Sequence, residues 1–388
     1  MRILCALTYY RPYISGLTIY VQRLATALAR RGHAVTVLTS QYDPSLPLTE
    51  WMDGVRVVRA PVVARVSKGV IMPTFGWLAT SLVWNHDVMS LHLPQFDAPG
   101  LALRGRLFRQ PVVLTYHSDL QLPFSMLNTV ANKVVDAANL AAGVLATRIV
   151  AYTQDFADHS PYLRRFREKI VVIPPPVEVA EATPEEIAAF RERWNLRRPV
   201  IGMAARLAAE KGVEVLLKAL PRVLEVYPET RVLFAGPHEN VLGEEAYAQR
   251  LAPEFARFSR HWTFLGTLGP REMAAFFPNL DVIVVPSLNS TETFGLVQVE
   301  AMLCGTPSIA SALPGVRQPV HQTGMGEVVP VGDSDALAAA ILRVIELRER
   351  YVRPRAEIAA KFSTERTAEA YEQLFETLRR RGSKGVSP

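Results

Sequence analysis

The chain has 388 residues, of which 49% are hydrophobic and 21% are charged. This composition is typical of globular proteins and excludes a disordered chain, a collagen-like repeat and a long coiled coil. The length predicts two or three domains with cores of their own. The net charge of +6 favours anionic partners, which include phosphorylated small molecules, anionic lipid surfaces and nucleic acid.

Two cysteines, Cys5 and Cys304, are too few for a disulfide framework or a four-ligand zinc site. Both lie in apolar stretches, so we expect inert thiols in a reducing compartment. No signal peptide is expected, because the first apolar run is short and no small-residue cleavage site follows it. The uncharged run at residues 69–86 is interrupted by proline, glycine and polar residues, and it predicts a buried helix rather than a membrane span. These features predict a cytoplasmic protein.

The first half of the chain alternates short apolar runs with helical stretches. We expect strands at residues 2–8, 34–40, 55–60, 88–93, 112–117, 148–153 and 169–173. Continuous Val/Ile/Leu runs of this kind are typical of parallel strands that are covered on both faces. Apolar residues at helical spacing predict a helix over residues 16–31, which ends at Gly32. The order strand, helix, strand with short links predicts parallel βαβ units.

The second half shows the same alternation of short apolar runs and helical stretches after the three prolines at 174–176. Thr183, Pro184 and Glu186 predict an N-cap, a first-turn proline and a capping-box glutamate. Strands are expected at residues 200–205, 231–235, 262–265, 282–286, 307–310 and 327–331, with helices that include 213–226 and 271–277. The predicted fold class is α/β, with two doubly wound, Rossmann-like domains. They are assigned to residues 1–180 and 200–363, with a linker at 181–199 and a last helix, 364–380, that packs back on the first domain.

Two cations follow the predicted strand at 200–205. Arg206 and Lys211 lie in a tight loop before Gly212 and a helix. Ligands of open α/β sheets bind beyond the carboxyl ends of the strands, so these cations can form a diphosphate clamp. Considered alone, they are better explained as solvated surface charges.

A second group follows the predicted strand at 282–286. Glu292 precedes Gly295, where the backbone can approach a ligand closely and where a helix can point its free N–H groups at an anion. Glu300 lies inside that helix, where a carboxylate can accept hydrogen bonds from a ribose diol. The alternatives are a helix-surface glutamate for Glu300 and a charge that complements the helix dipole for Glu292.

Together these residues resemble the retaining GT-B glycosyltransferases of family 4, the glycosyl transferases group 1. Residues 292–300 match the Glu-x7-Glu signature of that family, and Arg206 with Lys211 matches its Arg-x4-Lys phosphate pair. The likeness covers nearly the whole chain, and its further motifs are Ser15-Gly16, Leu91-His92-Leu93-Pro94, Thr115-Tyr116-His117-Ser118-Asp119, Ile173-Pro174 and Phe264-Leu265-Gly266. The resemblance implies a GT-B architecture, in which two Rossmann-like domains face each other across a cleft.

The resemblance also implies an activity and a set of site residues. The activity is retaining transfer of a hexose from a UDP- or GDP-linked sugar to a hydroxyl acceptor, in glycolipid, cell-envelope polysaccharide or small glycoside synthesis. Residues implied to be catalytic are His117, Glu292, Arg206 and Lys211. Residues implied to bind the donor are Gly16, Arg206, Lys211, Leu268, Glu292, Thr293, Phe294, Gly295, Leu296 and Glu300.

Each residue has an implied role. His117 lies beside the transferred sugar, and Gly16 lets the first loop approach the donor phosphates or sugar. Arg206 and Lys211 hold the diphosphate, and Glu292 with the amides of residues 293–296 holds sugar hydroxyls. Glu300 binds the ribose and the loop near Leu268 meets the base. Considered without the resemblance, the position of His117 at a strand end makes a catalytic role and a structural role equally plausible.

No metal site or cofactor is expected. Asp333 and Asp335 form an acidic pair, but they precede the helical pattern of residues 336–347, so Asp333 is predicted to be an N-cap. Two cations and a helix terminus can neutralise the leaving diphosphate, which predicts metal-independent transfer. No carboxylate nucleophile stands out in the sequence, and this favours front-face substitution over double displacement.

The acceptor is expected on the first domain, around residues 9–16, 64–77 and 117–130. Apolar stretches at 70–84 and 123–145, near Arg104, Arg106 and Arg109, could support peripheral contact with the inner membrane face, although core helices explain them better. No nucleic-acid partner is expected. Alternative functions are a nucleotide-sugar 2-epimerase and a non-catalytic sugar-nucleotide-binding protein. A dinucleotide-dependent dehydrogenase is disfavoured, because no G-x-G-x-x-G follows the first strand.

Overall fold

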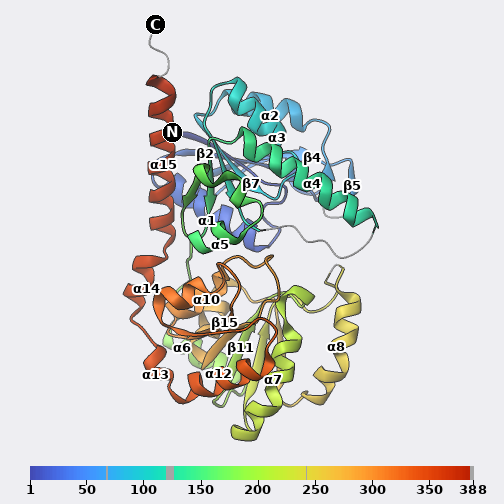
Figure 1. Cartoon of the computed structure of the whole chain (residues 1–388), viewed down its shortest axis with the longest axis vertical. Coiled ribbons are helices and arrows are strands. Elements are labelled where there is room, and N and C mark those ends of the chain that lie inside the picture. Colours follow the sequence, from blue (N-terminus) through green and yellow to red (C-terminus); the bar gives the residue numbers. More distant parts are fainter. Residues whose placement is uncertain (67–68, 119–125, 242, 385–388) are drawn as a thin grey trace. The chain divides into compact units, whose positions relative to one another are not determined.

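The computed structural model describes residues 1–66, 69–118, 126–241 and 243–384. The chain forms two compact units: Met1–Pro176 with Ser363–Pro388 is unit 1, and Val177–Phe362 is unit 2. Each unit holds a mainly parallel sheet that is covered by helices (Figure 1). The predicted class of two doubly wound α/β domains is therefore confirmed. The segment expected as a linker, 181–199, carries a helix of its own and lies in unit 2.

The main sheet of unit 1 has eight strands in the order β10-β9-β8-β7-β1-β2-β4-β3. Its strands are β1 (Arg2–Ala6), β2 (Ala34–Gln41), β3 (Thr49–Met52), β4 (Val55–Pro61), β7 (Val88–Leu93), β8 (Val112–Tyr116), β9 (Arg148–Ala151) and β10 (Ile170–Val172). The pairs are parallel except that β3 runs antiparallel to β4, and β5 (Ala64–Val66) pairs separately with β6 (Gly69–Ile71). From β1 the chain extends the sheet first toward β4 and later toward β10. The direction in which successive strands are added to the sheet therefore reverses between β1 and β7.

Helices cover both faces of the sheet of unit 1. They are α1 (Gly16–Arg30), α2 (Phe75–Trp84), α3 (Ala98–Leu107), α4 (Met126–Leu145), α5 (Gln154–His159), the 3-10 segment η1 (Leu163–Lys169) and α15 (Thr364–Lys384). Leu114 of β8 belongs to the core formed with α2 and α3, whereas the next residue, Thr115, bonds Tyr371 of α15. Because successive strand residues point to opposite faces, α15 covers the face opposite to α2 and α3. In Figure 1, α15 runs along unit 1 beside α1.

The uncharged run at residues 69–86 differs from the prediction of a buried helix. Its first part forms strand β6, and only Phe75–Trp84 is helical. One side of α2 is buried, but the Trp77 and Trp84 side chains are 87% and 67% exposed. The prediction is wrong in this respect because only one face of the helix meets the core. Among the residues that the structure describes, no helix has the length and apolar character needed to cross a bilayer.

The sheet of unit 2 has six parallel strands in the order β13-β12-β11-β14-β15-β16. Its strands are β11 (Val200–Ala204), β12 (Arg231–Ala235), β13 (Trp262–Gly266), β14 (Val282–Val285), β15 (Ser308–Ser311) and β16 (Gly326–Val329). Its helices are α6 (Pro184–Arg193), η2 (Ala209–Lys211), α7 (Val213–Val226), α8 (Glu245–Arg257), α9 (Pro270–Phe276), η3 (Phe277–Asn279), α10 (Leu296–Leu303), α11 (Gln318–Thr323), α12 (Ser334–Glu346), α13 (Arg348–Tyr351) and α14 (Arg355–Lys361). Here the order of connections reverses between β11 and β14.

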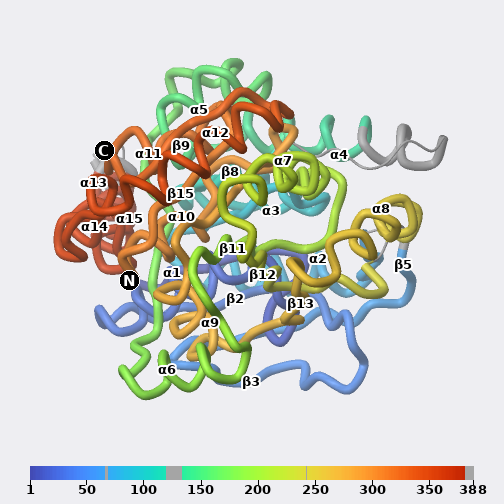
Figure 2. Tube along the Cα trace, turned by 90° about the horizontal axis from the view of Figure 1, so that it is seen from below, coloured from blue at the N-terminus to red at the C-terminus, as the bar shows by residue number. Residues whose placement is uncertain are grey.

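Successive residues of each strand in unit 2 point to opposite faces of the sheet. They therefore contribute to two cores, one beneath each layer of helices. Ile201 and Val232 pack with α7 and α12, and Val200 and Leu233 pack with α6, α9 and α10. Figure 2 shows α6 and α9 together at one side of the trace and α7 with α12 at another. The predicted capping box at Thr183 is confirmed, because its hydroxyl accepts a hydrogen bond from the Glu186 amide and the Glu186 carboxylate accepts one from the Thr183 amide.

Candidate active site

The connections in unit 2 reverse between two neighbouring strands, β11 and β14. At such a reversal the loops that leave the two carboxyl ends turn to opposite sides of the sheet, which opens a crevice for ligands. The loop after β11 carries Arg206 and Lys211, and the loop after β14 carries Glu292. The two predicted groups therefore lie at the same ligand-binding position of one sheet.

Three contacts join these two loops directly. The Lys211 Nζ lies 2.6 Å from the Glu292 Oε2, and the Leu288 amide donates to the Glu210 carbonyl at 2.9 Å. Gly212, with φ of +68°, lies against the carbonyl of Pro286. The Lys211 and Glu292 side chains are only 20% and 21% exposed. The positions of these two side chains are thus fixed relative to each other by the packing of unit 2.

Arg206 is more open than Lys211. Its side chain is 46% exposed, and its guanidinium donates to the Glu210 Oε1 at 2.8 Å. An exposed pair of this kind adds little to stability. The Arg206 side chain can therefore change partner at small cost.

Glu292 also caps the helix that follows it. Its Oε1 accepts a hydrogen bond from the Gly295 amide at 3.0 Å, and Gly295 has φ of +74° as the N-cap residue of α10. The carboxylate thus bridges an ammonium group and the N-terminal end of a helix. Both are groups that attract an anion.

Gln298 holds this helix terminus in place and was not anticipated from the sequence. Its side chain is fully buried, and its Nε2 donates to the carbonyls of Phe294 and Val316 at 3.0 and 2.9 Å. Its Oε1 accepts from the Ser308 hydroxyl at 3.2 Å. The available signal was an amide side chain in an otherwise apolar helical turn. Such a group needs buried partners.

The other predicted donor residues occupy the same edge of the sheet. Thr293 and Phe294 are buried, and Leu296 and Glu300 are half-buried on α10, one helical turn apart. Leu268 lies in the loop after β13, two strands from β11. Ser287 directly follows Pro286, and its buried hydroxyl has no hydrogen-bond partner among the described residues. A buried hydroxyl without a partner at this position is a group that a ligand can satisfy.

Gly16 and His117 belong to unit 1. Gly16 is the first residue of α1, and the Ser15 hydroxyl caps this helix by accepting from the Thr18 amide at 3.2 Å. Within the described part of the chain, a methyl group added at Gly16 would meet no atom within 4 Å apart from its chain neighbours and the backbone of its own helix. The fold itself therefore does not require glycine at this position.

The His117 imidazole follows β8 and has protein partners at both nitrogens. Its Nε2 lies 3.0 Å from the His92 Nδ1, and its Nδ1 is hydrogen-bonded to the Tyr152 hydroxyl. Burial lowers the pKa of His92 to about 3, and burial together with His92 lowers the pKa of His117 well below its usual range. Both rings are therefore neutral near pH 7. A bond from this imidazole to a sugar hydroxyl requires the exchange of one existing hydrogen bond.

Gln95 is a second residue that the sequence did not single out. It follows β7, the strand beside β1 at which the connections of unit 1 reverse. The Gln95 side chain is 2% exposed, and neither its Oε1 nor its Nε2 has a hydrogen-bond partner among the described residues. The two amide atoms form an unsatisfied donor and acceptor at the ligand-binding edge of this sheet.

Of Asp333 and Asp119, the structure describes only Asp333. Asp333 is the N-cap of α12, and its Oδ1 accepts from the Ala336 amide at 2.8 Å, as predicted. Asp119 lies outside the described residues. Within the described part of the chain, no three His, Cys, Asp or Glu side chains cluster as potential metal ligands.

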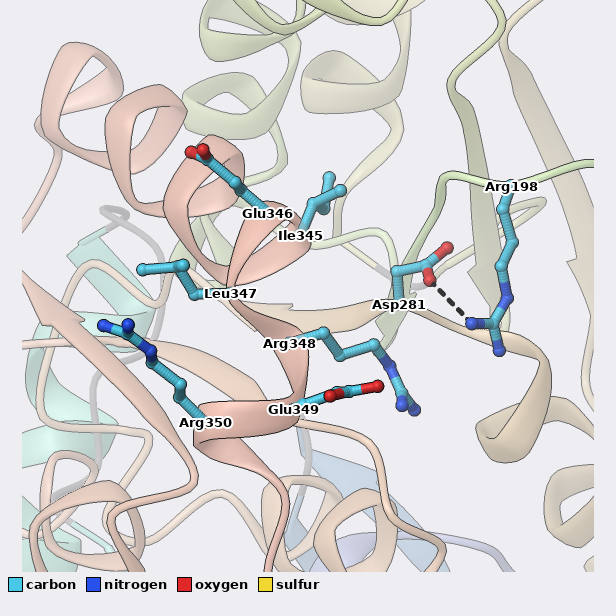
Figure 3. A pocket seen from close by; sticks show the side chains of 8 residues that line it. All are labelled: Arg198, Asp281, Ile345, Glu346, Leu347, Arg348, Glu349 and Arg350. Carbon is cyan, nitrogen blue, oxygen red and sulfur yellow. Dashed lines mark ion pairs between the residues drawn. The ribbon is translucent and has the colours of Figure 1, made fainter.

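A cavity of about 410 Å³ opens at the opposite edge of the unit 2 sheet (Figure 3). There the Arg198 Nη1 lies 3.4 Å from the Asp281 Oδ1, and the Asp281 Oδ2 accepts from the Val200 amide at 2.7 Å. Figure 3 shows Arg348 extending toward this pair and Arg350 pointing away. These contacts tie the amino ends of β11 and β14 together. The cavity is therefore distinct from the crevice at the carboxyl ends.

Comparisons with known proteins agree with this geometry. Residues 15–176 match the family described as Glycosyl transferase 4-like domain, and residues 185–361 match Glycosyl transferases group 1. A phosphatidyl-myo-inositol mannosyltransferase of Mycobacterium leprae is 28% identical over 396 residues, which cover 99% of each chain. A D-inositol 3-phosphate glycosyltransferase of Corynebacterium jeikeium is 29% identical over 402 residues, covering 95% of this chain and 93% of the relative.

Solved structures show the same architecture. Anabaena Alr3699/HepE in complex with UDP-glucose superposes with a TM-score of 0.76 at 19% identity, covering 97% of this chain and 100% of the other. The family matches extend over both units, and the predicted resemblance is confirmed. The chain belongs to the group 1 glycosyltransferases of family 4 and has the GT-B fold.

Proposed function

We propose that this glycosyltransferase transfers a hexose from a UDP- or GDP-linked sugar to a hydroxyl acceptor, with retention of anomeric configuration and without a metal ion. The observation that carries the proposal is the contact of Lys211 with Glu292 at the strand reversal of unit 2. It combines a fixed ammonium group with the N-terminal end of α10 at the position where α/β sheets bind nucleotides.

The proposed donor contacts follow from these groups. An ammonium has three N–H donors, so Lys211 can keep its bond to Glu292 and still bind a diphosphate oxygen. Arg206 can exchange Glu210 for the second phosphate. Preorganised cations and amide dipoles then stabilise the charge that develops on the leaving diphosphate. In other enzymes a divalent ion has this role.

Glu292 has a second proposed role, toward the sugar. Its carboxylate, with the amides of residues 293–296, is assigned to sugar hydroxyls. Glu300 is assigned to the ribose and the loop at Leu268 to the base. The buried Ser287 hydroxyl supports a polar ligand at this edge, because it has no partner among the described residues.

The proposed acceptor side lies on unit 1, with Gly16 and His117 near the transferred sugar. We assign front-face substitution because no carboxylate nucleophile stands out in the sequence, and the neutral His117 ring is assigned to a sugar hydroxyl as a hydrogen-bonding partner. We assign the Gln95 amide to a substrate hydroxyl, because it offers an unsatisfied donor and acceptor. Mass-spectrometric detection of a covalent sugar on Asp119 or another carboxylate would overturn the front-face route.

The names of the relatives narrow the acceptor class. One is named for a phosphatidylinositol and one for an inositol phosphate, at 28% and 29% identity. We therefore propose a polyol hydroxyl, either free or lipid-linked, as the acceptor.

A lipid-linked acceptor fits the surface of α2 and α3. Trp77, Trp84 and Leu107 are 87%, 67% and 68% exposed, and Arg104 and Arg106 lie on the same pair of helices. Apolar side chains flanked by arginines are typical of peripheral membrane contact. Sedimentation with phosphatidylglycerol vesicles at low salt tests this, and binding should be lost in a Trp77→Ser/Trp84→Ser variant. Failure of the wild-type chain to sediment at low salt removes the membrane part of the proposal.

Product analysis tests the activity itself. The purified chain is incubated with UDP- and GDP-hexoses and candidate polyols, with and without EDTA, and the anomeric configuration is read by proton NMR. Glycoside formation with retention in EDTA is the expected result. A strict manganese requirement contradicts the proposal that transfer needs no metal ion. Interconversion of sugar epimers without an acceptor would favour a 2-epimerase. Tight binding without turnover would favour a binding protein.

A further inference from the structure

Three buried hydroxyl groups in unit 1 connect segments that are far apart in the sequence. The Tyr371 hydroxyl on α15 lies 2.8 Å from the Tyr20 hydroxyl on α1 and 2.7 Å from the Thr115 Oγ1 on β8. All three side chains are fully buried. The C-terminal helix is thus hydrogen-bonded to a strand residue 256 positions earlier in the chain.

Both partners of Tyr371 lead to His117. Thr115 is two residues before His117 in the same extended segment, so their side chains leave the backbone on the same side. The Tyr20 ring meets the His117 ring edge-on at 4.8 Å and stacks on Tyr152 at 5.3 Å. Tyr152 in turn bonds the His117 Nδ1.

The hydrogen bonds continue beyond His117 as a chain. They run from Tyr152 through His117 to His92, and the His92 Nε2 lies 3.3 Å from the Ser90 hydroxyl. A neutral imidazole has one N–H and one lone pair, so these protons can all point one way or all the other. Tyr152 and Tyr20 both contact the His117 ring, so their placement bears on the orientation of that ring.

A tyrosine at position 371 is not explained by packing alone. Phe375, one turn later on the same face of α15, is fully buried without a hydroxyl. Burying a hydroxyl in a core is unfavourable unless it is hydrogen-bonded. The hydroxyl at 371 meets this condition through its hydrogen bonds to Tyr20 and Thr115.

We propose that Tyr371 is a positioning residue for His117. Through Tyr371, the C-terminal helix sets the orientation of the His117 ring, which the proposed function places near the transferred sugar. This inference rests on the proposed transfer reaction for its effect on rate, but not for its effect on the ring of His117. Tyr371 contacts no substrate in this proposal. It acts through Tyr20 and Thr115.

The test compares Tyr371→Phe with Glu372→Gln in the full chain. The first variant removes only the hydroxyl. The second removes the charge of the neighbouring side chain and so weakens its contacts with Arg31 and His33, which tie the same helix to unit 1 away from His117. Tyr371→Phe should lower kcat about ten- to a hundredfold with an unchanged donor KM, the range for small misplacement of a catalytic group. Glu372→Gln should lower the Tm and leave kcat unchanged.

A spectroscopic readout separates this inference from the proposed function. In protein labelled with 15N-histidine, the ring signals of His117 and His92 should shift in Tyr371→Phe and in Thr115→Val, but not in Glu372→Gln. The double variant of 371 and 115 should lose no more activity than Tyr371→Phe alone, because removal of the Tyr371 hydroxyl already breaks its bond to Thr115. Unchanged ring signals in Tyr371→Phe overturn the inference, as does an equal loss of kcat in Glu372→Gln. If no donor is turned over by the wild-type chain, the proposed function fails, and the ring signals still decide the positioning role.

Discussion

Gly212 and Pro286 approach each other more closely than any side chain would allow. A methyl group built on Gly212 would lie 2.0 Å from the Pro286 carbonyl oxygen, and the glycine has φ of +68°. Gly212 follows Lys211, and Pro286 follows β14, so this contact joins the two halves of the candidate donor site. The close approach of the backbones sets the distance from which Lys211 reaches Glu292.

Replacing Gly212 with alanine should therefore destabilise unit 2 and weaken the site together. The left-handed backbone conformation alone costs about 1–2 kcal/mol for a residue with a Cβ, and relief of the clash must separate the two loops. We expect a lower Tm and a lower kcat/KM for the donor. A Gly212→Ala protein with the wild-type Tm would contradict the structure at this point.

For alanine at Gly16 we expect the opposite effect on stability. The space around it is open, and alanine is a better helix former than glycine by about 1 kcal/mol, so Gly16→Ala should keep or raise the Tm. If the first loop approaches the donor, the added methyl should lower kcat/KM nonetheless. Thermal unfolding and donor kinetics on the same preparation check both parts. Wild-type kinetics in this variant would remove Gly16 from the site.

Removal of the two cations tests the diphosphate clamp. Arg206→Ala and Lys211→Ala should each reduce transition-state stabilisation by about 2–4 kcal/mol, the scale of one preorganised electrostatic contact. Lys218 of α7 is exposed and outside the crevice, so Lys218→Ala serves as the matched control. The measured quantity is kcat/KM for the donor. A loss in the control as large as in the other two variants would point to overall charge instead of a clamp.

Much of the fold follows from local sequence patterns. The strands β7 and β12 and helix α7 have the predicted bounds, because largely apolar runs and a clear helical period lie between polar, glycine, proline or tyrosine residues. Strand β3, which pairs antiparallel with β4, was not predicted. Its sequence, Thr-Glu-Trp-Met, has no apolar run, and its pairing depends on the edge offered by β4.

The site was predictable in its residue types but not in its pairings. Arg206, Lys211 and Glu292 stand out because charged residues follow apolar strands. The partners of His117 could not be read from the sequence, because His92 and Tyr152 come from two other strand ends that meet only in the folded sheet. Gln298 and Gln95 were missed for a similar reason. An amide is informative only when its burial is known.

The buried histidines predict a specific loss of stability in mild acid. The pKa of His92 is lowered by burial from its ordinary value of 6.5 to about 3. Below pH 6.5 the unfolded chain therefore binds a proton that the folded chain does not, and the free energy of unfolding falls as the pH falls toward 3. Between pH 7 and 5 this one residue should account for about 2 kcal/mol.

Urea unfolding of the wild type and of His92→Gln at a series of pH values measures this contribution. The variant should lose less stability between pH 7 and 5, and the two proteins should show the same pH dependence between pH 7 and 8. Equal slopes below pH 6.5 would mean that His92 is accessible to protons in the folded state.

Glu300 tests whether α10 binds the nucleoside part of the donor. The residue is half-buried on the helix that begins at Gly295, one turn after Leu296, and the family signature assigns it to the ribose. Glu300→Ala should raise the Kd for the nucleoside diphosphate alone about ten- to a hundredfold, since a hydrogen bond to a charged group contributes about 1.5–3 kcal/mol. Isothermal titration with UDP and GDP measures this directly. Glu300→Gln should recover part of the affinity, because its amide oxygen can still accept a ribose hydroxyl. Nucleotide affinity equal to the wild type in both variants would leave Glu300 as a helix-surface charge and would move the ribose to another part of the crevice.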